Sequence, residues 1–107
     1  MAVRLTKDWI PVSEVLTSLK GNLGVFEFAN VQREVVFIGF AGGKSQFGLK
    51  GEVALALDKY SDIAAFRFEI TTAYHTRYRE LLMAHIADHD TLPHYNEQIT
   101  LGRLSPS

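Results

Sequence analysis

Two short, nearly continuous hydrophobic runs lie in the first half of the chain, separated by the polar stretch 30–33. Runs of this length joined by a short polar connection are typical of a β-hairpin, so the pattern predicts strands at about 24–30 and 34–40. The second run is almost uninterrupted from Val35 to Phe40. Apolar residues on both faces indicate a strand that is buried on both faces. We therefore expect the strand at 34–40 to be the central strand of its sheet.

Three other segments follow a helical period and predict helices at about 11–20, 47–59 and 73–88. Pro11 favours a helix start, because its missing N–H costs nothing in the first turn, and Gly21 offers a stop. Between the last two helices, residues 65–70 alternate apolar with charged side chains. This alternation predicts a strand with one face in water, on which Arg67 and Glu69 lie together.

These elements give the order α-β-β-α-β-α and the fold class α/β (α+β), with a small antiparallel three-stranded sheet flanked by helices. A chain of 107 residues is expected to form a single domain, residues 1–107. Within it we expect an N-terminal helix extension at 1–23, a core at 24–96 and a frayed tail at 97–107. Trp9 and Ile10 are expected to dock onto the body of the domain.

Composition places the chain among ordinary globular proteins, with 47% hydrophobic and 21% charged residues. Cysteine is absent, which excludes disulfides and thiolate metal sites. The net charge is −1, from 11 basic and 12 acidic residues, so binding to nucleic acid would need a local basic patch. Neither a signal peptide nor an apolar run of membrane-spanning length is found. We therefore expect a cytoplasmic protein with no membrane partner.

The hairpin carries a family resemblance. Residues 24–26 read Gly-Val-Phe, ten residues follow, and residues 37–39 read Phe-Ile-Gly. Further on, Glu80 lies inside a predicted helix and residues 93–96 read Pro-His-Tyr-Asn. This order and spacing resembles the signature of the GIY-YIG nucleases, with phenylalanine at both tyrosine positions, a helix glutamate and a closing P-x-x-N. The resemblance spans about residues 24–96 and implies the same fold.

The resemblance also implies roles for individual residues. Glu80 would bind one divalent cation, Mg²⁺ or Mn²⁺, and Asn96 would be a buried organiser beside it. Lys50 would take the place of the family's arginine, with Lys44 as the other candidate. Phe26 and Phe37 take the tyrosine positions, where a phenyl ring can neither donate nor accept a hydrogen bond. Catalysis would then need a hydroxyl from elsewhere, and the candidates are Tyr60, Tyr74 and Tyr95.

The helical period leaves two interpretations of Glu80. On the predicted helix 73–88 it falls opposite Tyr78, in a stripe of small residues with Ala73 and Ala84. Small residues allow a helix to approach a sheet closely, and a carboxylate there would need a cation, a metal or backbone donors. Alternatively, Glu80 is an exposed helix residue that pairs locally with Arg77 or Thr76. Similarly, the amide of Asn96 could simply tie down a turn after Pro93.

A glycine-rich stretch follows the second predicted strand and contains Gly42, Gly43, Lys44 and Ser45. The phosphate loop of nucleotide hydrolases needs a glycine five places before Gly43, and Ile38 stands there instead. A looser phosphate-binding cradle remains open, built from Lys44, Ser45 and backbone N–H groups. Otherwise the glycines serve a tight strand-to-helix turn.

Two further clusters lie on the predicted helix 73–88. The first contains Tyr74, His75, Arg77 and Arg79, which could contact nucleic acid or could be a solvated helix start. In the second, His85 and His89 are four residues apart and could face one metal, with Asp88 and Asp90 nearby, but no third ligand stands at motif spacing. Histidines at a helix end also favour the helix dipole.

Two functions follow. The preferred one is a divergent GIY-YIG-like domain with a degenerate active site, which binds nucleic acid or a protein partner without cutting strands. The alternative is a divalent-metal-dependent nuclease or phosphodiesterase that uses Glu80 and Lys50. We prefer the first because the departures from the family pattern fall on the residues that would carry the chemistry.

Overall fold

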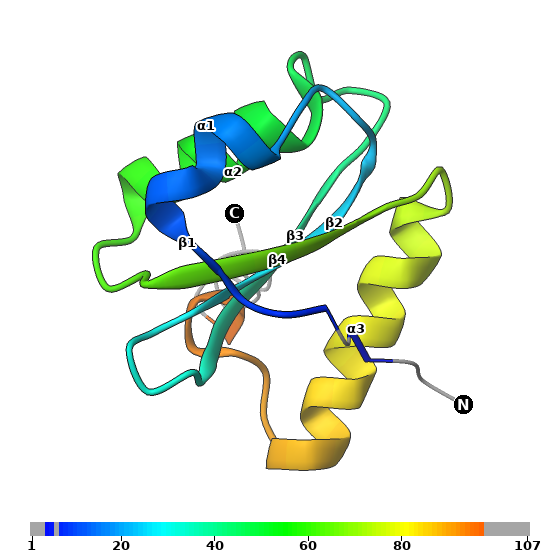
Figure 1. Cartoon of the computed structure of the whole chain (residues 1–107). Helices are drawn as coiled ribbons and strands as arrows, with labels where there is room; N and C mark the ends of the chain where they lie inside the picture. The colour runs from blue at the N-terminus through cyan, green and yellow to red at the C-terminus, as the bar shows by residue number, and fades with distance from the viewer. Residues whose placement is uncertain (1–3, 6, 98–107) are drawn as a thin grey trace, which may run out of the picture.

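The computed structural model describes residues 4–5 and 7–97. These residues form a four-stranded antiparallel sheet in the order β1-β4-β2-β3, covered by helices on both faces (Figure 1). The elements follow one another as β1 (Ile10–Pro11), the 3-10 turn η1 (Val12–Glu14), α1 (Val15–Ser18), β2 (Gly24–Ala29), β3 (Val35–Ala41), α2 (Gly48–Lys59), β4 (Ala65–Ile70) and α3 (Tyr74–His89). Residues 94–97 are also helical. The α+β class is therefore confirmed, whereas the sheet has four strands and not the expected three.

The additional strand arises at the N-terminal side, where the sequence predicted a helix over 11–20. Ile10 and Pro11 pair with Phe66 and Ala65 at the edge of β4, and helical structure begins only at Val12. An edge position accepts proline because its missing N–H then faces away from the neighbouring strand. The expected helix is therefore found over 12–18, as η1 and α1, and only its start was wrong. Pro11 fits the first turn of a helix and an edge strand equally well.

The β-hairpin is confirmed, with a six-residue β2 and a seven-residue β3. Its turn is closed by Asn30, whose side-chain oxygen accepts the N–H groups of Gln32 and Glu34, each at 3.0 Å. Arg33 takes a left-handed conformation with φ 65°. A local side-chain hydrogen bond of this kind is the usual way in which asparagine fixes a turn.

β3 is an edge strand, so its expected central position was wrong. It is nevertheless buried along most of its length, because α2 packs on one face and α3 on the other. The two faces have separate cores. Phe26, Phe28 and Phe37 belong to the core under α1 and α2, while Val25 and Ile38 join Leu81 of α3 in the second core. Burial of both faces thus comes from helices and not from strands on both sides.

The face of β4 that was expected to lie in water is covered. The Arg67 side chain is only 18% exposed, and its guanidinium lies 4.1 Å from the ring centroid of Trp9. Trp9 therefore does dock onto the body of the domain, as the sequence predicted. The Glu69 side chain, on the same face of β4, is held by Arg77 of α3. The alternation of β4 was interpreted wrongly because its charged residues face charged partners on other elements.

The helix at 73–88 is confirmed as α3, which ends with Asp90 in a left-handed conformation at φ 62°. Its buried residues are Leu81 and Ala84, while Ala73, Thr76 and Ala87 are exposed. Ala84 is thus the buried member of the stripe of small residues, and the stripe as a whole does not approach the sheet. In the part of the chain that the structure describes, no helix has the length and apolar character needed to cross a membrane. Of the tail expected at 97–107, Glu97 ends the helical segment 94–97, and the rest lies outside the described residues.

Candidate functional site

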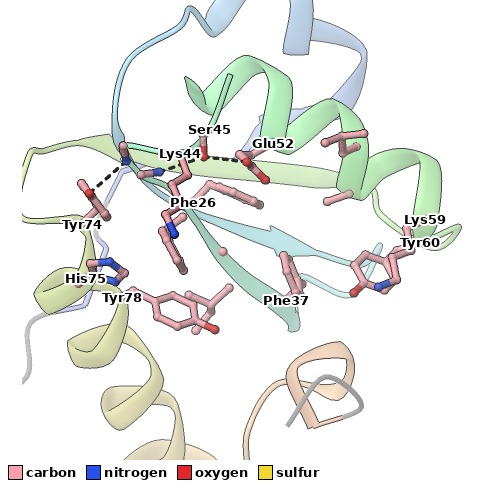
Figure 2. A pocket seen from close by; sticks show the side chains of 17 residues that line it. Phe26, Phe37, Lys44, Ser45, Glu52, Lys59, Tyr60, Tyr74, His75 and Tyr78 are labelled. Carbon is pink, nitrogen blue, oxygen red and sulfur yellow. Dashed lines mark hydrogen bonds between the residues drawn. The ribbon is translucent and has the colours of Figure 1, made fainter. Parts of the chain in front are cut away.

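An open pocket with a volume of about 640 Å³ lies along β3, between α2 and α3 (Figure 2). Because the two helices cover opposite faces of the sheet, they leave the edge of β3 between them. The lining comes from β2, β3, the loop after β3, both helices and Tyr60. Residues that are distant in sequence therefore meet here only once the sheet has formed.

The floor of the pocket contains the two phenylalanines that occupy the tyrosine positions of the signature. The rings of Phe26 and Phe37 are adjacent, with centroids 5.9 Å apart, and both are buried. Gly39 lies beneath them: a Cβ atom built there would be 2.4 Å from Cζ of Phe26 and 2.8 Å from Cε2 of Phe37. The glycine is thus required for the close approach of the two rings.

Replacing Gly39 with alanine is expected to lower the free energy of unfolding by about 1–3 kcal/mol, because the buried rings must shift to admit the methyl group. Urea denaturation followed by circular dichroism measures this loss. Gly43→Ala is the matched control: its Cβ would lie 3.5 Å from Oη of Tyr74, an ordinary contact, and a change of no more than about 0.5 kcal/mol is expected. Equal stabilities of the two variants would show that the rings adapt.

The glycine-rich loop forms one rim of the pocket, and its backbone N–H groups already have partners. The N–H of Gly42 donates to Oγ of Ser45 at 3.0 Å, and that of Gly43 donates to Oη of Tyr74 at 3.1 Å. Ser45 donates its own N–H to the carbonyl of Gly42 and its hydroxyl to Oε2 of Glu52, the latter at 2.7 Å. These hydrogen bonds shape the loop, so a phosphate would have to displace them to use these three amides. Lys44 is exposed and extends from the loop into the space between the helices (Figure 2).

The opposite wall comes from the first turns of α3, through Tyr74, His75 and Tyr78. Phe40 of β3 lies against all three: its ring stacks on Tyr74 with an interplanar angle of 9° and lies 5.0 and 4.9 Å from the rings of His75 and Tyr78. Tyr74 and His75 were predicted from the sequence, whereas Phe40 and Tyr78 were missed. At the other end of the pocket, Lys59 ends α2 and Tyr60 follows it, and both were also missed as binding residues.

Asn96 is buried and bonds to β3 with both ends of its amide. Oδ1 accepts the N–H of Ile38 at 2.7 Å, and Nδ2 donates to the carbonyl of Ile38 at 2.8 Å. Nδ2 also lies 3.5 Å from Oη of Tyr78. The side chain therefore satisfies the outward-facing backbone N–H and carbonyl of Ile38 on the edge strand, as the backbone of a neighbouring strand would. Its amide is tied to backbone, but to a strand 58 residues away and not to the local turn.

The structure describes both Glu80 and Lys50, and neither of them lines the pocket. Glu80 accepts a hydrogen bond from Nη1 of Arg77 at 3.3 Å, which is the local pairing that the helical period allowed. Arg77 in turn donates Nε to both carboxylate oxygens of Glu69, at 3.1 and 3.0 Å. Arg77 thus links α3 to β4, whereas Arg79 is exposed to solvent. The cluster predicted to contact nucleic acid is therefore split, and only Tyr74 and His75 line the pocket.

The three tyrosines considered as substitute hydroxyls have different surroundings. Tyr60 lines the pocket and lies 5.1 Å from Phe37 between ring centroids. Tyr74 lines it too, but its hydroxyl accepts the N–H of Gly43. Tyr95 stacks on Tyr60 and donates its hydroxyl to Asp62, and this hydrogen bond raises the pKa of the phenol. Tyr95 is not among the residues that line the pocket.

A buried ion pair that the sequence gave no signal for lies beneath α3. Nε of Arg67 donates to Oε1 of Glu27 at 2.7 Å, and the Glu27 side chain is only 7% exposed. Burial raises the pKa of Glu27, and the hydrogen bond and positive charge of Arg67 oppose this rise. The residues are 40 positions apart, and Glu27 sits inside an apolar strand where a core residue would be expected.

His85 and His89 lie at a second hollow, of about 610 Å³, beyond the other end of α3. Their ring centroids are 4.5 Å apart, and Nδ1 of His85 hydrogen-bonds to the carbonyl oxygen of Thr91 at 2.7 Å. Among residues 4–5 and 7–97, no three His, Asp or Glu side chains gather closely enough to hold a metal ion. The two histidines therefore have no third metal ligand beside them among these residues, in agreement with the sequence, where none stands at motif spacing.

Fold and pocket together define a small α+β domain with an aromatic pocket at the edge of its sheet. Over residues 3–88 the chain matches the family described as "Domain of unknown function (DUF7508)", and it belongs to that family. No curated protein and no solved structure matches the chain.

Proposed function

We propose that this domain binds single-stranded nucleic acid in the pocket along β3, as a divergent GIY-YIG-like module that does not cut strands. The observation that carries the proposal is the aromatic wall of the pocket, where Phe40, Tyr74 and Tyr78 are half-buried and His75 is exposed. The rings of Phe26 and Phe37, at the two signature positions, are buried and close the floor with carbon. Aromatic rings bind unpaired bases by stacking, whatever the base, because every base has a π face. A pocket at a sheet edge, lined by rings from both cores, suits such a ligand.

Charge at the rim supports a phosphate-bearing ligand. Lys44 and Lys59 line the pocket from its two ends, and both are exposed. Glu52 is the acidic residue among them, so the local balance is positive although the whole chain carries a net charge of −1. Lysines beside stacking rings are a common arrangement for a single strand, whose phosphates alternate with exposed bases.

The arrangement of the remaining residues favours binding over cleavage. Neither Phe26 nor Phe37 can position a water molecule or stabilise charge by hydrogen bonding. Glu80, the implied metal ligand, is paired with Arg77, and neither Glu80 nor Lys50 lines the pocket. The groups that the alternative nuclease would need are therefore separated from the rings that mark its active centre.

Fluorescence anisotropy with labelled single-stranded oligonucleotides of about ten nucleotides tests the proposal. We expect binding by the wild type and a loss of about tenfold in affinity for Lys44→Ala/Lys59→Ala, with one to two phosphate contacts removed. The slope of log K against log salt should be reduced by about 0.7–1.4, since each phosphate contact on a single strand contributes about 0.7. Lys20→Ala/Lys50→Ala removes the same charge outside the pocket and should retain most of the affinity.

Absence of binding to every oligonucleotide would contradict the proposal, as would equal losses in the two lysine double variants. The same oligonucleotides, incubated with Mg²⁺ or Mn²⁺, separate binding from cleavage. We expect intact strands. Metal-dependent cutting by the wild type that disappears in Glu80→Ala would instead establish the nuclease.

A further inference from the structure

Glu52 is an acidic residue in a pocket that otherwise suits an anionic ligand, and the proposed function does not use it. We propose that the pocket takes an unpaired base carrying an exocyclic amino group, which means adenine, cytosine or guanine, and that Glu52 selects these bases over thymine and uracil. This inference rests on the proposed function, since it assigns the ligand of the same pocket.

The Glu52 carboxylate is held in place by a chain of hydrogen bonds. The N–H of Gly42 donates to Oγ of Ser45 at 3.0 Å, and this hydroxyl donates to Oε2 of Glu52 at 2.7 Å. Within the part of the chain that the structure describes, Oε1 of Glu52 has no hydrogen-bond partner. One oxygen is thus fixed by the loop, and the other is available to a ligand.

An ionised carboxylate accepts hydrogen bonds and donates none. It therefore pairs with the amino group of cytosine or adenine, as glutamate and aspartate do when they read cytosine in a DNA groove. Thymine and uracil present a carbonyl oxygen in place of the amino group, so two acceptors would face each other there and N3–H is the one ring donor left to the carboxylate. The difference in binding free energy between the two kinds of base is larger in a half-enclosed pocket than in open water, because the local dielectric constant is lower.

The other groups of the pocket place a base where Glu52 can reach its edge. Tyr74 reaches the loop through its hydrogen bond with the N–H of Gly43, and Glu52 lies at the rim beside Ser45 of the same loop (Figure 2). A base in the pocket would lie against the half-buried rings of Tyr74 and Tyr78, with its edge directed to the rim. The lysines are left to contact the phosphates on either side.

Anisotropy titrations with oligonucleotides of only dA, only dC or only dT, each of about ten nucleotides, test the assignment. The wild type should bind dA and dC about tenfold more tightly than dT. Glu52→Gln should bind all three within about a factor of three, because an amide can donate to thymine as well as accept from adenine or cytosine. Asp58→Asn, on the exposed side of α2, removes the same charge and should keep the preference.

A ligand-side substitution gives a readout that does not depend on the folding of a variant. An oligonucleotide of purine, which is adenine without its amino group, should bind the wild type as weakly as dT does. A preference that survives in Glu52→Gln, or purine binding equal to that of dA, would overturn the assignment. Tight but indiscriminate binding by the wild type would also overturn it and leave the proposed function intact, whereas failure of all oligonucleotides to bind would remove both.

Discussion

Replacing Asn96 with alanine is expected to lower the free energy of unfolding by about 2–5 kcal/mol. The amide satisfies both the N–H and the carbonyl of Ile38, which is fully buried. Truncation leaves two buried backbone groups without partners, and each costs about 1–3 kcal/mol. Urea denaturation at neutral pH, followed by circular dichroism, measures the loss.

Two further variants distinguish hydrogen bonding from lost volume. Asn96→Asp keeps the size of the side chain but directs an acceptor, in place of a donor, at the carbonyl of Ile38, so it should be at least as destabilising as alanine. Asn22→Ala removes an exposed asparagine and should change stability by no more than about 0.5 kcal/mol. An Asn96→Asp variant as stable as the wild type would show that packing, and not the paired hydrogen bonds, holds the chain at Ile38.

Asn96 shows which features of the fold could be predicted from the sequence and which could not. The closing P-x-x-N indicated Asn96, and its burial agrees with the expectation of a buried organiser. Its partner could not be predicted, because Ile38 becomes an outward-facing edge residue only through the order of the strands. The apolar run of β3 reports burial but carries no information on whether strands or helices cover it. The hairpin was easier to predict, since a local turn at Asn30 fixes it.

The pocket illustrates a similar limit. Phe26 and Phe37 were singled out by spacing along the chain, and the structure places them side by side. Glu52 and Tyr78 were missed because each follows an ordinary helical pattern, and they meet only through helices on opposite faces of the sheet. The glycine loop was predicted as a phosphate cradle from composition, without the hydrogen bonds that Tyr74 and Ser45 make to it.

The second large effect is expected at the buried ion pair. Arg67→Met should lower the free energy of unfolding by about 3–5 kcal/mol at neutral pH, because it leaves the Glu27 carboxylate buried without its donor. The variant also loses the contact of the guanidinium with Trp9. Thermal or urea unfolding measures the loss, and Arg79→Met, at an exposed position of α3, serves as the control with an effect of no more than about 0.5 kcal/mol.

The pH dependence of this variant follows from Glu27. Burial raises the pKa of Glu27 and Arg67 opposes the rise, so removal of Arg67 should raise the pKa further. The folded state then holds the proton more tightly than the unfolded chain, and stability falls as pH rises through the raised pKa. The deficit of Arg67→Met relative to the wild type should therefore be smaller at pH about 5 than at pH about 7.

A double variant separates the cost of an unpaired charge from the value of the pair. Glu27→Leu/Arg67→Met replaces both partners by apolar side chains and should recover most of the stability that Arg67→Met loses, since well-packed apolar residues often replace a buried ion pair at little cost. It should also lose the pH dependence, because the titrating carboxyl group is gone. A deficit in Arg67→Met that does not change with pH, and that persists in the double variant, would assign the role of Arg67 to its packing against Trp9.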